Sequence, residues 1–319
     1  MTGGEFKPEV PLMSPTSFWN QIASMNTIFL GILFEATPFL LVGSMASGLI
    51  EVFVSQDDLI RLIPNRLIPA TVVGGLLGVI FPVCDCGVVP LTRRLCQKGM
   101  PSSAGIAFLL AAPILNPIVI VSTYAAYGWG KVFVSRLILG LLVAIWVGLI
   151  FSFNRSPAGG VNPVFILNPP EREPAPVPSA VPFGQRLQTA LRIAGDDFFS
   201  MGRFFILGAL LAALAQTILP SKILIAAGSG PLSSVLSMQT LAFMLSVCST
   251  VDAFISLAFV KLFSTGSILS FLVFGPMIDF KSTLMFLGVL RPKMVVYLIL
   301  LTFLTVALVT VFINVVLGW

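Results

Sequence analysis

The sequence predicts an all-α membrane protein that crosses the bilayer several times and is built from two related halves. Three observations lead to this prediction. The chain of 319 residues is 57% hydrophobic and only 10% charged, whereas a soluble domain carries about 25% charged residues. Long stretches contain no charged residue at all, and short motifs recur in both halves at a nearly constant offset.

The charge-free stretches set the fold class. They comprise residues 67–84, 99–130, 137–154, 204–221, 223–251, 262–278 and 294–319. Each approaches or exceeds the roughly 20 apolar residues that a helix needs to cross the hydrocarbon layer. Because lipid offers no hydrogen-bond partners to the backbone, these stretches are expected to be helices. The alternating pattern of a membrane β-barrel is absent.

The first half, residues 1–153, is expected to contain about four spans. The expected helical segments are 18–53, which includes Glu35 and Pro38, then 67–83, a short piece at 88–98, 101–127 with a break at 113–117, and 131–153. A continuous helix over 67–98 would be about 48 Å long, too long for one crossing. The sequence Cys84-Asp85-Cys86-Gly87 is therefore either the tip of a re-entrant hairpin or the centre of an additional span.

A linker is predicted at residues 154–183. Eight prolines lie between Asn154 and Pro182, and such a composition favours an extended, flexible segment without a core. The basic residues in and near this segment place it in the cytoplasm, because cytoplasmic loops carry an excess of Lys and Arg. The second half, residues 184–319, is expected to contain about four further spans with broken or re-entrant helices.

An internal repeat is predicted from matching motifs. Phe34 and the run ending at Gly43 match Phe199 and the run ending at Gly208, an offset of 165 residues; Val83 matches Val247 at 164. The Pro113 motif matches the Pro276 motif at an offset of 163 residues. Repeats of this kind are a common transporter architecture, with the substrate site near the midplane where broken helices meet. An odd number of crossings per half would make the repeats inverted, and an even number would make them parallel.

Several motifs resemble a known family. The strings Phe81-Pro-Val-Cys-Asp-Cys-Gly-Val-Val-Pro90, Ala111-Ala-Pro-Ile-Leu-Asn-Pro117 and Ser122-Thr-Tyr-Ala-Ala-Tyr-Gly128 are similar to the predicted permease family of YraQ and ArsP proteins. The resemblance covers nearly the whole membrane portion. It implies a permease fold, and the characterised relatives imply export of trivalent organoarsenicals. Those exporters are expected to carry a small residue between the two cysteines, where this chain has Asp85.

The cysteines are candidate substrate ligands. Cys84 and Cys86 flank Asp85 at the break, and Cys248 is expected to approach Cys84 if the repeat is real. Thiolate sulfur suits soft, thiophilic ions such as As(III), Sb(III) or Cu(I), so three thiols around one ion are a further hypothesis. The alternative is that these residues are small buried apolar side chains, as most free cysteines are. Cys96 is expected to be incidental.

Acidic residues inside membrane segments are costly and are functional candidates by default. Asp85 and Asp252 are predicted to contact the substrate and, together with Glu35 and Asp279, to take up and release protons. The alternative is that each acid caps a broken helix or pairs with a lysine, either Lys261 or Lys281.

Asn116 is a further candidate for substrate contact. It occupies the same place after a proline as Asp279 does in the second half. Both are predicted to satisfy backbone groups freed by a helix break. The cluster of Arg93, Arg94 and Lys98 is expected to lie in a cytoplasmic loop.

The predicted function is a membrane permease, namely a secondary active exporter of a small thiophilic substrate such as a trivalent (organo)arsenical. Two alternatives remain, a permease or channel for a small anion or sulfur compound and a membrane thiol oxidoreductase. The chain has no histidine and no Walker A motif, so we expect neither an ATPase nor another enzyme, no cofactor and no nucleic-acid partner. The expected partners are the lipid bilayer and the substrate, with a homo-oligomer left open, in the inner membrane of a prokaryote.

Overall fold

The fold is all-α, as predicted. A computed structural model describes residues 15–55, 63–64, 66–81, 83–153, 183–218 and 230–316, and in these ranges it has helices and no strand. The helices are α1 (Pro15–Phe53), α3 (Leu67–Ile80), α4 (Asp85–Gln97), α5 (Ser102–Leu115), α6 (Pro117–Tyr127), α7 (Lys131–Phe153), α8 (Phe183–Ile218), α10 (Pro231–Leu245), α11 (Asp252–Leu257), α12 (Thr265–Met277), α13 (Phe280–Leu287) and α14 (Pro292–Val316).

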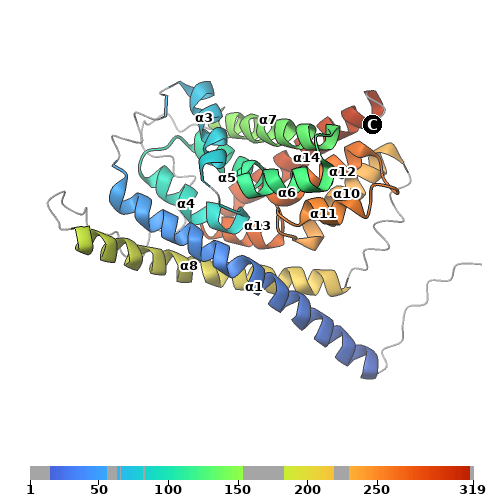
Figure 1. The fold of residues 1–319 in the computed structure, drawn as a ribbon, viewed down its shortest axis with the longest axis horizontal. Helices are drawn as coiled ribbons and strands as arrows, with labels where there is room; N and C mark the ends of the chain where they lie inside the picture. The colour runs from blue at the N-terminus through green and yellow to red at the C-terminus, as the bar shows by residue number, and fades with distance from the viewer. Residues whose placement is uncertain are drawn as a thin grey trace, which may run out of the picture.

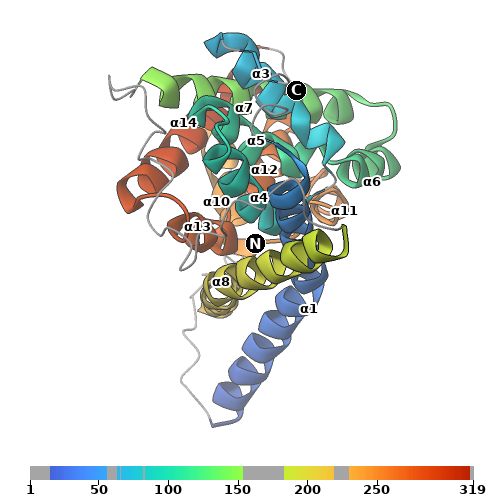
Figure 2. The same cartoon turned by 90° about the vertical axis from the view of Figure 1, so that its left-hand side faces the viewer.

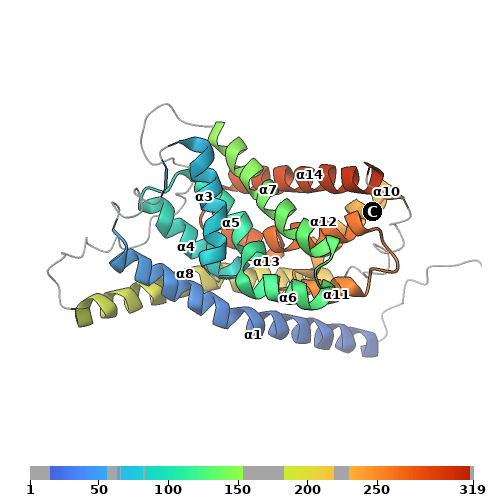
Figure 3. The same cartoon turned by 45° about the horizontal axis from the view of Figure 1, so that its top comes forward.

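The helices form three layers. The two longest helices, α1 and α8, lie side by side along one face, while α7 and α14 lie on the opposite face (Figures 1 and 3). Most of the short helices lie between these two pairs, whereas α3 lies at the outer side next to α7, as the view in Figure 2 shows. Phe53 stacks near Phe183, with ring centroids 5.8 Å apart, and Ser47 contacts Asp197 further along. The helices α1 and α8 are therefore antiparallel.

The described residues contain fewer candidate spans than the eight expected. Within them, five helical segments are long and apolar enough to cross a membrane, and α5 with α6, bent by 42°, forms a sixth candidate. The shorter α3 has 14 residues and a length of about 21 Å, less than the hydrocarbon thickness of about 30 Å. Charge-free sequence alone does not distinguish such a short helix from a span, which is why the prediction was too high.

The helices α3 and α4 form a hairpin that enters and leaves at the same end of the molecule. A Cβ on Gly74 would meet the backbone of Ala104, and one on Gly78 would meet Ala112, so α3 runs parallel to α5. The helix α4 returns to where α5 begins, and Lys98 after it donates to the carbonyl of Val54 at 2.7 Å. We call α3 and α4 the first hairpin, and we call the described residues 81 and 83–86, where the two helices meet, the first tip.

The helices α10 and α11 form a second hairpin that opens toward the other end. Ser234 bonds to Ser267 at 2.8 Å and Ser270 donates to the carbonyl of Val235, so α10 runs parallel to α12. The hydroxyl of Tyr127 bonds to Ser256 at 2.7 Å, and α11 runs along α6 away from the Lys98 end. We call residues 246–251, between α10 and α11, the second tip.

The two halves present their elements in the same order. Each has a long helix, a hairpin, a span broken near its middle and a final long helix. Among the described residues, each half has three candidate spans and one hairpin, and the two hairpins open to opposite ends. An inverted repeat requires this arrangement. The equivalence of the halves stays a prediction. The predicted linker lies outside the described residues up to Pro182, and its last residue, Phe183, begins α8.

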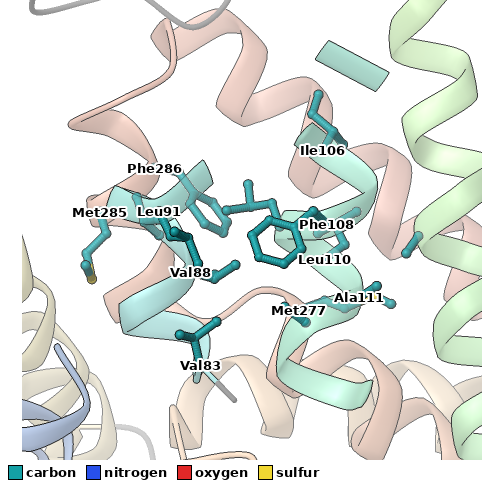
Figure 4. Close-up of a cluster of buried hydrophobic side chains, with 14 of the residues drawn as sticks. Val83, Val88, Leu91, Ile106, Phe108, Leu110, Ala111, Met277, Met285 and Phe286 are labelled. Atoms are coloured by element: carbon teal, nitrogen blue, oxygen red, sulfur yellow. The ribbon is translucent and has the colours of Figure 1, made fainter. Parts of the chain in front are cut away.

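A buried apolar cluster joins the halves (Figure 4). Val88 and Leu91 of α4 face Phe286 of α13, and Phe108 of α5 lies beside them. All of these side chains are at most 2% exposed. The same cluster reaches Val83 in the first tip, so the packing between the halves holds the first tip in place.

We predict that Gly43→Ala destabilises the protein. A Cβ at Gly43 would collide with the backbone of Gly87, and overpacking of this kind costs about 1–3 kcal/mol. The control is Gly31→Ala on the same helix, where a Cβ meets nothing within 4 Å. Melting temperatures in detergent should fall for the first variant and stay or rise for the second. Equal melting temperatures would contradict the close contact between α1 and α4.

We also predict the orientation of the molecule in the membrane. A single cysteine at the exposed Gln97 should face the cytoplasm, because basic residues cluster at this end. One at Trp129, which is 80% exposed between α6 and α7, should face the outside. An impermeant maleimide applied to intact cells should label the second and not the first. The reverse pattern would invert the assignment.

Candidate functional site

The predicted cysteine pair lies at the first tip. Cys84 precedes the first turn of α4, Asp85 begins that helix and Cys86 follows. Their two sulfur atoms and one carboxylate oxygen all lie within 4.8 Å of one another, and all three residues are buried. The thiol of Cys86 donates to Oδ2 of Asp85 at 3.9 Å. The sequence motif therefore becomes a compact group of two thiols and one carboxylate.

Lys281 of α13 neutralises this group from the second half. Its ammonium lies 3.3 Å from Oδ2 of Asp85 and 3.4 Å from Oδ2 of Asp279. It also donates to the carbonyl of Ser246 in the second tip at 3.1 Å. From the sequence, Lys281 was predicted only as one of two lysines that could pair with an acid. The other, Lys261, is exposed.

The second tip brings Cys248 close to the same charges. Cys248 is 5% exposed and accepts a hydrogen bond from the hydroxyl of Thr250 at 3.4 Å. Ser246, two residues before Cys248, accepts a hydrogen bond from Lys281, which forms the ion pair with Asp85. Among the described residues, however, the sulfur of Cys248 is not part of the group within 4.8 Å. The hypothesis of three thiols around one ion would therefore need the two tips to move closer.

Asp252 pairs with Arg136, a residue that the sequence analysis did not single out. The guanidinium of Arg136 lies 2.7 Å from Oδ2 of Asp252 and donates to Thr123 at 2.8 Å and to the carbonyl of Ser249 at 3.4 Å. Arg136 is fully buried on α7. The ion pair therefore links the first half to the start of α11 in the second half.

The two predicted helix caps are confirmed as caps. The side chain of Asn116 accepts from the amide of Ile118 at 2.9 Å at the start of α6. The side chain of Asp279 accepts from the amide of Ser282 at 2.7 Å, in a capping box at the start of α13. These bonds satisfy amides that a helix start leaves without partners. A substrate contact by either residue stays a prediction.

The remaining predicted acid, Glu35, lies on α1 away from these contacts. It is half-buried and makes no ion pair among the described residues.

The short helix predicted at residues 88–98 is present within α4 and its C-cap, but two members of its basic cluster do not lie in a loop. Arg93 and Arg94 are both 4% exposed and lie on a buried helix. Arg94 makes two bonds to Asp197 of α8, at 3.1 Å and 2.9 Å, and Ser47 of α1 donates to the same carboxylate at 2.7 Å. The prediction failed because the partner carboxylate is 103 residues away in sequence.

The chemistry of the first tip is that of a soft-ligand site. Two sulfur atoms two residues apart at the start of α4 suit an electrophile that accepts two thiols, while the carboxylate between them accepts the thiol hydrogen of Cys86. Non-helical backbone at membrane depth is tolerated only where protein or water surrounds it. The thiols thus lie in a buried polar site at the meeting of the two hairpins.

We predict that Arg136→Gln is strongly destabilising. It leaves Asp252 as an uncompensated buried charge, and breaking a buried ion pair in this way costs about 3–5 kcal/mol. Adding Asp252→Asn to this variant should recover part of the lost stability, because the orphaned charge is removed. Detergent denaturation of the two single variants and the double variant measures this. A double variant no more stable than Arg136→Gln would contradict the assigned pair.

Comparisons with known proteins agree with this architecture. The family model ArsP_1, described as a predicted permease, matches residues 21–315. A UPF0718 protein named YcgR from Bacillus subtilis (strain 168) is 44% identical over 277 residues, which cover 86% of this chain and 92% of the relative. No solved structure matches the chain.

Two further relatives carry informative names. A putative two-component membrane permease complex subunit from Streptococcus mutans is 36% identical over 273 residues, 84% of this chain and 87% of the relative. The UPF0718 protein YraQ from Escherichia coli (strain K12) is 26% identical over 105 residues, 33% of this chain and 30% of the relative. The family match and these alignments identify the chain as a multi-pass membrane protein that belongs to the ArsP_1 family of predicted permeases.

Proposed function

We propose that this permease is a secondary active exporter of a small thiophilic substrate such as a trivalent (organo)arsenical. The observation that carries the proposal is the group formed by Cys84, Asp85 and Cys86, whose ligand atoms lie within 4.8 Å of one another at a buried helix break. We assign Cys84 and Cys86 as the residues that bind the substrate. Asp85 accepts a hydrogen bond from Cys86, and one of its carboxylate oxygens lies within 4.8 Å of both sulfur atoms.

The binding step that this site supports is an exchange of hydroxyl groups for thiols. A trivalent arsenical with two hydroxyl groups would form one As–S bond to Cys84 and one to Cys86. Each As–O bond that breaks releases a hydroxyl group, which leaves as water with the hydrogen of the incoming thiol. No electrons are transferred and the charge of the site is unchanged, so a buried site holds the substrate without an added desolvation cost.

The position of the site supports alternating access. The first tip belongs to the proposed first half, residues 1–153, and the second tip to the proposed second half, residues 184–319, so the site lies where the halves meet. In transporters built from repeats, one repeat rocks against the other around such a midplane site. The proline-rich linker at 154–183 would join the two halves in the cytoplasm.

We propose that a proton gradient supplies the energy for export. The residues that would take up and release the protons are among the carboxylates of Glu35, Asp85, Asp252 and Asp279. The three aspartates are engaged with Lys281 or Arg136. Glu35 is the one of the four that makes no ion pair among the described residues.

Transport of a small anion is the second candidate, favoured by the two buried cations at the tips. Both cations, however, already bond to carboxylates, Lys281 to Asp85 and Arg136 to Asp252. An anion would have to displace a carboxylate from one of them. This competition makes the thiophilic substrate the better supported of the two.

We further propose that the chain works with a second protein subunit in the plasma membrane of a prokaryote. The support is the description of the relative from Streptococcus mutans as a subunit of a two-component complex. A homo-oligomer would be the alternative assembly.

We predict that everted membrane vesicles containing this protein take up phenylarsine oxide when energised. Cys84→Ser and Cys86→Ser should each lower the uptake at least about tenfold, because each removes one of two ligands. The matched control is Cys96→Ser, a buried cysteine on the same helix away from the tip, which should transport normally. Antimonite, silver ions, sulfite and phosphate complete the substrate panel. Wild-type uptake in both tip variants, or uptake of the anions alone, would contradict the proposal.

A further inference from the structure

Lys281 stands out because one ammonium contacts three breaks in the helices. It lies 3.3 Å from Asp85 at the first tip and 3.4 Å from Asp279 at the break between α12 and α13. It donates to the carbonyl of Ser246 at the second tip. The residue itself is 2% exposed. Lys281 therefore bonds the two tips to each other.

The backbone of Lys281 is held in a fixed place. A Cβ on Gly208 of α8 would meet the Cα of Lys281, so α13 lies directly against α8 at this residue. The capping box between Asp279 and Ser282 fixes the turn that carries it. Because this backbone is fixed, a movement of the first tip away from α13 stretches or breaks the ion pair between Lys281 and Asp85.

One oxygen atom connects the thiols to this ammonium. Oδ2 of Asp85 accepts from the thiol of Cys86 and also forms the ion pair with Lys281, at 3.3 Å. When substrate takes the sulfur of Cys86, the thiol hydrogen leaves and this oxygen loses a donor. The ion pair with Lys281 then remains as the contact of this oxygen. Occupancy of the thiols thereby changes the bond between the two halves.

Stability alone does not account for this arrangement. Buried ion pairs contribute little net stability, and apolar residues of similar size often replace them without loss. We infer that Lys281 is a positioning residue that couples substrate binding at Cys84 and Cys86 to movement of the two halves. This inference rests on the proposed function and extends it to a residue that does not itself bind the substrate.

Substrate binding and transport are expected to depend on different residues. Both thiols belong to the first tip, so the first half can bind substrate without Lys281. Transport requires that the second half move when substrate binds, and we assign the transmission of this movement to the ammonium of Lys281. Loss of the ammonium should therefore leave the affinity nearly unchanged and lower the turnover.

The test uses Lys281→Met in the full chain, with phenylarsine oxide as the probe. Binding to purified protein should stay close to wild type, while uptake into everted vesicles per folded molecule should fall about tenfold or more, since coupling between sites is typically worth 5–150-fold. Lys281→Arg should restore part of the uptake because it restores the charge. The matched control is Lys261→Met, the same change at an exposed lysine, and it should behave as wild type.

Three results would overturn the inference. The first is normal uptake by Lys281→Met, and the second is an equal loss of binding and uptake, which would make Lys281 part of the binding site or the fold. The third is a wild-type protein that binds no phenylarsine oxide, which would remove the proposed function itself. If Lys281→Met does not fold, Lys281→Gln keeps a donor for the carbonyl of Ser246 and carries the same test.

Discussion

Everything in the centre of this protein depends on satisfying backbone groups where helices are interrupted inside the membrane. The second tip shows how this is done. Gln216 donates to the carbonyl of Leu245 and Lys281 to that of Ser246, while Arg136 and Ser122 donate to those of Ser249 and Thr250. Without such donors each carbonyl would lie unpaired in a medium that offers no water, at a cost of several kcal/mol. Lys281 and Arg136 therefore supply hydrogen bonds to the interrupted backbone in addition to their ion pairs.

The same requirement brings the two halves into contact. Lys281 belongs to the second half and bonds to Asp85 of the first, whereas Arg136 belongs to the first half and bonds to Asp252 of the second. Asp85 and Asp252 each begin the outgoing helix of a hairpin. A movement of one half against the other must therefore act on these pairs. The thiols of the first tip lie next to one of them, which is how a bound substrate would influence the movement.

Much of the fold could be predicted from the sequence, because apolar length and helix breaks are local properties. The break at residues 113–117 and the caps formed by Asn116 and Asp279 followed from proline, asparagine and aspartate at their positions. The ion pairs could not be predicted, since Arg136 and Asp252 are 116 residues apart and no local pattern relates them. The predicted number of spans was also wrong, because α3 is as apolar as a spanning helix but too short to cross the membrane. The close approach of Cys84 and Cys86 was predictable from their spacing, but their position beside Lys281 was not.

The central claim is that the thiols of Cys84 and Cys86 bind the substrate at the meeting of the two hairpins. X-ray absorption at the arsenic edge tests it most directly, with one equivalent of phenylarsine oxide bound to the purified protein. The account predicts two sulfur neighbours per arsenic in the wild type and in Cys96→Ser, and their loss in the double variant Cys84→Ser, Cys86→Ser. Two sulfur neighbours that persist in the double variant, or none in the wild type, would contradict it.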